Sequence, residues 1–237
     1  MDPPIWLRPE TERRATGRPA ELSRTRIVDA ATVLAERGGL AAVTTRRVAA
    51  ELGAGSASLY RHLRNRVDLI DLMVDAAFER YEPPPVTGAW RSDLVAEHMH
   101  RLRYLRARPW LVEAIFQRPP LGPATQVVLE HLLALLADHP APGQAKLEAI
   151  GVLTGMVQTY LLNERPGQGV LDPQFVQART TMLVRAAHDG QHPHLAKVVA
   201  EVLGEASTAV GQPDDESADA QLIRVLGSVL DGLLPEH

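Results

Sequence analysis

The chain has 237 residues and no cysteine, so disulfide bonds, thiolate zinc sites and cysteine nucleophiles are excluded. No apolar run reaches the roughly 18 residues of a membrane helix and the start is no signal peptide, so we expect a cytoplasmic protein with no membrane partner. The formal net charge is −4. Residues 1–66 carry twelve arginines against seven carboxylates, whereas the remainder is acidic, which suits a basic binding region on an acidic body. Aromatic residues make up only 4% of a chain rich in Ala, Leu, Arg and Glu, which predicts an all-α fold.

The first 21 residues mix proline, arginine and glutamate with little apolar content, which predicts a flexible basic tail. Its arginines either form an arm along DNA or simply keep the tail soluble. They are Arg8, Arg13, Arg14 and Arg18. The first helix is predicted to begin after Ser23 as its N-cap and to stop at Gly38 and Gly39, because apolar residues recur at helical spacing between them.

Three shorter elements follow. Thr44 is the expected cap of a second helix that ends at Gly53, and a Gly-containing turn leads to a third helix from Ser56 to Leu63. A fourth helix is predicted from near Arg66, and prolines 83–85 forbid its continuation. The rest of the chain predicts seven more helices divided by Pro and Gly, which gives about eleven in all. They cover about 91–108, 110–117, 122–138, 144–164, 173–188, 194–209 and 218–234.

Two short helices separated by a tight turn and packed on a preceding helix are the ingredients of a helix-turn-helix. The third helix turns small and hydrogen-bonding side chains away from its apolar positions Leu59 and Leu63, and this surface suits a DNA major groove. The alternative is an exposed polar face on an ordinary helix. The side chains concerned are Ser56, Ala57, Ser58, Tyr60, Arg61 and His62.

The stretches Thr44–Gly53 and Ser58–Leu63, with the helix start at Asp68 and Leu69, resemble the N-terminal domain of TetR-family repressors. The resemblance covers about residues 23–80 without a gap. It implies that Thr45 binds phosphate, that Arg46 reads a base, and that Ser56, Ala57 and Ser58 lie over base edges. It further implies that the DNA backbone is held by Tyr60, His62 and Arg66.

The resemblance also sets the expected architecture. It predicts a three-helix helix-turn-helix DNA-binding domain at 22–66, a connecting helix at 67–81, and a helical ligand-binding and dimerisation domain at 88–237. The C-terminal likeness rests on Trp90, on Arg108-Pro109-Trp110, on the run from Arg118 to Pro123 and on the helix Leu147–Glu164. We expect a small-molecule effector in a pocket lined by His100, Tyr104, Trp110, Phe116, Gln117, Met156 and Tyr160, each of which also suits plain core packing.

The helices near 144–164 and 218–234 are too apolar for surface helices of a monomer, so they are either ordinary core helices or part of an interface. The resemblance to the TetR family implies that they pair with their copies in a four-helix bundle, so a homodimer is expected. Such a dimer would place its two third helices one DNA turn apart on an inverted-repeat operator, as a repressor released by its ligand. The sequence equally permits an activator or an architectural factor.

No metal or cofactor is expected besides an unknown effector. His98 and His100, like His192 and His194, are two residues apart, a spacing that points side chains to different sides of a helix. The rival class is a helical-bundle enzyme. The chain has no nucleophile elbow, phosphate-binding loop or helical metal motif, so we expect no enzyme.

Overall fold

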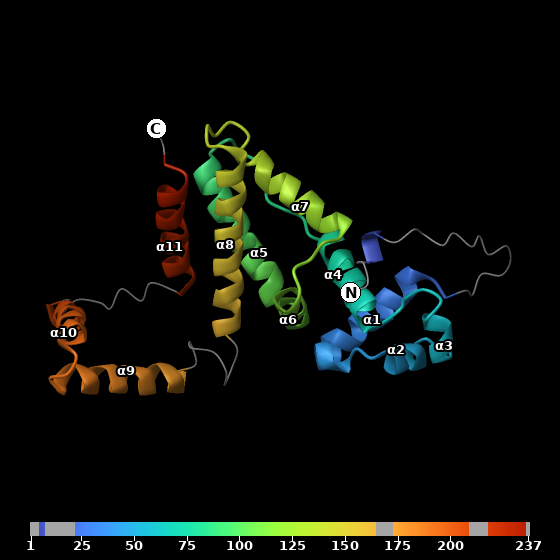
Figure 1. The fold of residues 1–237 in the computed structure, drawn as a ribbon, viewed down its shortest axis with the longest axis horizontal. Coiled ribbons are helices and arrows are strands. Elements are labelled where there is room, and N and C mark those ends of the chain that lie inside the picture. The colour runs from blue at the N-terminus through green and yellow to red at the C-terminus, as the bar shows by residue number, and fades with distance from the viewer. Residues whose placement is uncertain (1–4, 8–21, 165–172, 209–217, 236–237) are drawn as a thin grey trace. The chain divides into compact units, whose positions relative to one another are not determined.

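The computed structural model describes residues 5–7, 22–164, 173–208 and 218–235, and these ranges contain helices and no strand (Figure 1). The chain divides into two compact units, Met1–Ile150 and Gly151–His237, with the division inside helix α8. The predicted all-α fold is therefore confirmed. The first unit holds η1 (Ile5–Leu7), α1 (Arg24–Gly38), η2 (Leu40–Ala42), α2 (Thr45–Glu51), α3 (Ser56–Leu59), α4 (Arg66–Glu79), α5 (Trp90–Arg106), α6 (Pro109–Gln117), α7 (Pro123–Ala134) and the start of α8 (Gly143–Asn163). The second holds the rest of α8 with α9 (Pro173–His188), α10 (Pro193–Thr208) and α11 (Ala218–Leu233).

The predicted caps set the starts of the first two helices. The Ser23 hydroxyl accepts a hydrogen bond from the Arg26 amide at 3.2 Å, and the Thr44 hydroxyl accepts one from the Arg47 amide at 3.2 Å. Gly39 follows α1 with a φ of 70°, a backbone conformation that favours glycine. Helix α1 contacts α2, η2 and α4, so these elements form one small bundle.

Helix α3 is shorter than predicted. Regular helix ends at Leu59 rather than Leu63, because the Leu59 carbonyl accepts from the amides of both His62 and Leu63 and tightens the chain into turns. The two apolar positions nevertheless lie in the core as expected, with Leu59 0% and Leu63 3% exposed. The polar residues 60–62 therefore follow the helix in a turn.

Helix α4 begins with a reciprocal cap. The Asn65 side chain accepts from the Asp68 amide, and the Asp68 carboxylate accepts from the Arg64 amide, each at 2.9 Å. The helix ends at Glu79, four residues before the first of the three prolines. It contacts α1, α6 and α7, so it joins the N-terminal helices to the helices that follow.

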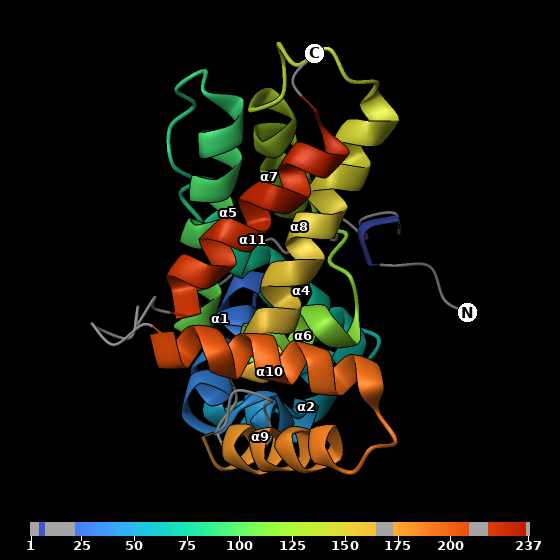
Figure 2. The ribbon, with the colours of Figure 1, turned by 90° about the vertical axis from the view of Figure 1, so that its left-hand side faces the viewer.

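The remaining helices of the first unit pack around α5 and α6. Helix α6 contacts α4, α5 and the η2 turn, and its Trp110 is 3% exposed. Asp93, in the first turn of α5, holds the preceding segment by accepting from the Thr87 hydroxyl at 2.6 Å and from the Thr87 and Gly88 amides. In the second unit, α9 and α10 contact each other (Figure 2).

Three residues of the predicted tail, Ile5–Leu7, belong to the described part of the chain. Ile5–Leu7 form a single 3-10 turn in which Ile5 is 7% exposed, because apolar residues concentrate there in an otherwise polar segment. The tail arginines Arg8, Arg13, Arg14 and Arg18 lie outside the described residues. No helix of the described part of the chain is long and apolar enough to cross a membrane.

Candidate functional site

The first candidate site is the surface formed by the start of α2 and the α3 region. Thr45, the first residue of α2, is half-buried, and its hydroxyl oxygen lies 3.5 Å from the hydroxyl oxygen of Tyr60. This contact brings together residues 15 positions apart in the sequence. Arg46 and Arg61 are exposed, and the side chain of Tyr60 is 55% exposed although it is aromatic. An exposed tyrosine between exposed arginines suits phosphate contacts better than core packing.

The other predicted DNA-contacting residues belong to the same elements. Ala57 is exposed, whereas Ser56, Ser58 and His62 are half-buried. Small residues on α3 leave room for a DNA groove to approach, while buried Leu59 anchors the helix to the core.

Arg66 has a different environment from the other predicted DNA ligands. At the start of α4, its Nε donates to the Val43 carbonyl and its Nη2 to the Leu40 carbonyl, both at 2.7 Å. Its guanidinium therefore takes part in the fold of the N-terminal bundle.

The second candidate site is a buried polar cluster between the end of α4, α5 and α7. Glu97 is 0% exposed, and its Oε1 accepts from the Tyr81 hydroxyl at 2.8 Å and from Arg101 at 3.1 Å. His131 Nε2 lies 3.9 Å from the other carboxylate oxygen, which is too far for a hydrogen bond. Glu97 Oε2 and His131 Nε2 therefore both lack a hydrogen-bond partner among the described residues. Burial and the nearby Glu97 charge raise the pKa of the Tyr81 hydroxyl, so it remains a donor at neutral pH.

Two more polar atoms in this helical region lack partners within the described chain: Trp110 Nε1 and His98 Nε2. His98 Nδ1 bonds the Leu94 carbonyl at 2.7 Å, and burial together with the Arg101 charge lowers the pKa of His98 to about 3. The imidazole is therefore neutral, with Nδ1 as the donor and Nε2 as an available acceptor. A buried polar atom without a hydrogen-bond partner destabilises the folded protein by about 1–3 kcal/mol. These atoms therefore mark positions suited to a polar ligand.

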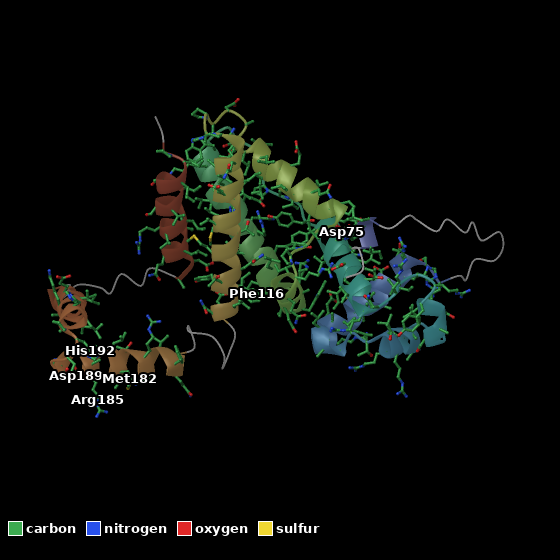
Figure 3. The ribbon with its side chains drawn as sticks, in the orientation of Figure 1. Asp75, Phe116, Met182, Arg185, Asp189 and His192 are labelled. Carbon is green, nitrogen blue, oxygen red and sulfur yellow. The ribbon has the colours of Figure 1, made fainter. Side chains whose placement is uncertain are left out.

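The predicted pocket residues do not form a single lining. The His100 ring is tilted against Tyr81 and the Tyr104 ring meets it edge-on, with ring centroids 5.5 and 5.0 Å away, and the Tyr104 hydroxyl donates to the Ala77 carbonyl. Phe116 is 56% exposed at the end of α6 (Figure 3), so the structure does not place it in a closed pocket.

The other three residues lie elsewhere. Gln117 lies beside a cavity of about 200 Å³ between α4 and the segment that links α6 to α7. Met156 and Tyr160 line a depression in the second unit together with Leu222 of α11.

The sequence did not predict the four residues of this polar cluster as pocket candidates: Tyr81, Glu97, Arg101 and His131. Glu97 and Arg101 are four residues apart on α5, a spacing that usually marks an exposed ion pair, and here both are buried. No group of three or more His, Cys, Asp or Glu among the described residues is arranged to hold a metal ion.

Comparison with known proteins agrees with this geometry. The family model "Tetracyclin repressor-like, C-terminal domain" matches residues 82–233, and "Bacterial regulatory proteins, tetR family" matches residues 27–73. The chain belongs to the TetR family. This family consists of transcriptional regulators that bind DNA, rather than enzymes, and the DNA-binding model spans α1 to the middle of α4.

Individual relatives extend over most of this TetR-family chain. The transcriptional repressor DrrR1 of Streptomyces coeruleorubidus is 32% identical over 84% of this chain and 76% of its own length. A transcriptional regulator of Saccharopolyspora erythraea is 30% identical, covering 81% and 80%. Among solved structures, apo ActR of Streptomyces coelicolor is 25% identical, with a TM-score of 0.71 over 90% of this chain and 95% of ActR.

Proposed function

We propose that this chain is a repressor that binds an inverted-repeat operator as a homodimer and releases it when a small molecule enters the C-terminal domain. The observation that carries the proposal is the surface of α2 and the α3 region, where exposed Tyr60 contacts Thr45 at the start of α2 and Arg46 and Arg61 are exposed. The proposed DNA contacts are Thr45, Arg46, Ser56, Ala57, Ser58, Tyr60, Arg61 and His62.

Exposed apolar residues on α8 and α11 support the homodimer. Val152 of α8 and Ile223 of α11 are 42% and 43% exposed, although both helices are mostly apolar. A Cβ atom built on Gly151 or Gly155 would meet nothing within 4 Å, so the backbone of α8 is open to a close neighbour. Pairing of α8 and α11 with their copies would cover these side chains.

The buried polar cluster supports the ligand site. An effector with hydrogen-bond donors and acceptors could pair with Glu97 Oε2 or with Trp110 Nε1, two atoms that lack partners within the described chain. The structural relative ActR has been solved in complex with actinorhodin and with (S)-DNPA, both of which are small molecules. We therefore propose that the effector binds within the helices α5–α7.

The test begins with selection of a duplex from a random library by the purified protein. Fluorescence anisotropy then measures its affinity across salt concentrations, with Arg46→Ala and Tyr60→Ala as variants. We expect two protomers per duplex, a steep salt dependence, and weaker binding by both variants. Actinorhodin serves as the first probe for release. Failure to enrich any duplex would contradict the proposed function.

A further inference from the structure

Arg66 joins the start of α4 to the turn that precedes α2. Its Nε and Nη2 donate to the carbonyls of Val43 and Leu40, each at 2.7 Å. The two carbonyl residues are 0% and 1% exposed. These nitrogens lie along one edge of the planar guanidinium, so two parallel donors meet two acceptors that the fold holds in place.

The Val43 carbonyl directly precedes the residue that caps α2. Thr44, the next residue, caps α2, whose first backbone bond runs from the Val48 amide to the Thr44 carbonyl at 2.9 Å. The Val43 carbonyl lies outside that helical pattern, and Arg66 is the donor that the described hydrogen bonds give it. The position of Thr44, and with it the start of α2, therefore depends on this bond.

We propose that Arg66 is a positioning residue that holds the start of α2 in place, and that it is not a phosphate ligand. This inference rests on the proposed DNA-binding function. It departs from the role implied by the resemblance, in which Arg66 holds the DNA backbone. If the Nε and Nη2 edge turned to bind a phosphate instead, both carbonyl bonds would break and a buried acceptor would be left without a donor.

The two roles predict different salt dependence. A phosphate ligand releases counterions, so its removal lowers the slope of log affinity against log salt by about 0.9 per contact, or about 2 per dimer. A positioning residue weakens binding by the same factor at every salt concentration. Arg66→Lys also distinguishes a phosphate ligand from a positioning residue, because lysine keeps the charge that binds phosphate but lacks the paired donors of the guanidinium edge.

The experiment measures the affinity of Arg66→Ala and Arg66→Lys for the selected duplex at several salt concentrations, with Arg61→Ala as the control for loss of an exposed arginine at the DNA-binding surface. We expect both Arg66 variants to lose about fivefold or more in affinity with the wild-type slope, because each leaves the buried carbonyl unpaired. The control is expected to lower the slope.

Hydrogen exchange in the absence of DNA tests the same bonds without relying on function. Amides of residues 40–47 are expected to exchange at least about fivefold faster in both Arg66 variants than in the wild type, and no faster in Arg61→Ala. Unchanged exchange, a lowered slope in Arg66→Ala, or full affinity in Arg66→Lys would each overturn the proposal. If the wild type selects no duplex, the proposed function fails, and the exchange rates still decide whether Arg66 holds this segment.

Discussion

Replacing Gly122 by alanine is expected to break a contact between α4 and α7. Gly122 has φ −75° and ψ 167°, which alanine adopts without strain, so the effect would be steric alone. An added Cβ would lie 2.0 Å from Asp75 Oδ1 and 2.5 Å from its Cγ. The Asp75 side chain, in a residue only 5% exposed, would have to move (Figure 3).

The cost follows from what the Asp75 carboxylate does. Its Oδ1 accepts from the Ala124 amide at 2.9 Å, whereas Gly122, the N-cap position of α7, has no side chain to cap the helix. Asp75 therefore caps α7 from a different helix. Loss of an N-cap costs about 1–2 kcal/mol, and leaving a buried carboxylate without its donor adds about 1–3 kcal/mol. We expect Gly122→Ala to lower the free energy of unfolding by about 2–5 kcal/mol.

A double-mutant cycle with Asp75→Ala isolates this contact. Asp75→Ala removes both the cap and the atoms closest to the new Cβ, and only the Cβ of residue 75, at 2.9 Å, still requires a small shift. Gly122→Ala should therefore lower the free energy of unfolding by at least about 1 kcal/mol less in the Asp75→Ala background than in the wild type. Urea unfolding followed by circular dichroism, at one protein concentration, measures all four proteins. The steric reasoning would be refuted if the effects of the two substitutions on the free energy of unfolding were additive, or if Gly122→Ala alone lowered it by less than about 0.5 kcal/mol.

Four further predictions follow from single side chains. Tyr60→Phe keeps the ring and removes the hydroxyl, so we expect about threefold weaker operator binding by anisotropy with unchanged thermal unfolding. Glu97→Gln keeps an acceptor for the Tyr81 hydroxyl but removes the carboxylate charge, so we expect it to reduce ligand-induced release at least tenfold, and equal release would contradict the proposed anchor. Hydrogen bonds from Thr87 and Gly88 outweigh burial and hold the pKa of Asp93 below its usual value. The ionised Asp93 therefore stabilises the folded protein above the usual pKa of an aspartate, and this stabilisation is lost as the pH falls through the folded pKa. Asp93→Asn should weaken this acid dependence of the free energy of unfolding. Ile223→Asp places a charge on the proposed α11 interface, and light scattering should show monomers if that interface forms the dimer.

Local chemistry was enough to predict the helices and their capped starts. The hydroxyls of Ser23 and Thr44 satisfy amides that a helix start leaves unpaired, and both were found as predicted. The length of α3 was wrong, because the turn after Leu59 depends on how its carbonyl is shared between two amides. Periodicity locates apolar residues but does not show which hydrogen-bond pattern closes a short helix.

The ligand-site candidates were harder to predict, because their contacts join distant parts of the chain. Glu97 and His131 are 34 positions apart, and nothing near either residue indicates the other. Large aromatic residues were favoured instead, and Phe116 is largely exposed. Pocket chemistry depends on which polar atoms the packing leaves without partners, and a single sequence does not contain that information.

The contacts of Glu97 also suggest how ligand binding would act on DNA binding under the proposed function. Tyr81 follows α4, and its hydroxyl donates to the same carboxylate that a ligand would approach. Tyr104 of α5 donates to the Ala77 carbonyl near the end of α4, so two hydrogen bonds join α5 to this end of α4. A ligand that draws Glu97 away from Tyr81 would weaken one of them. Since α4 begins at Arg66 beside the start of α2, a shift of α4 would reach the DNA-binding surface directly, and the ligand would favour the arrangement that binds DNA less well.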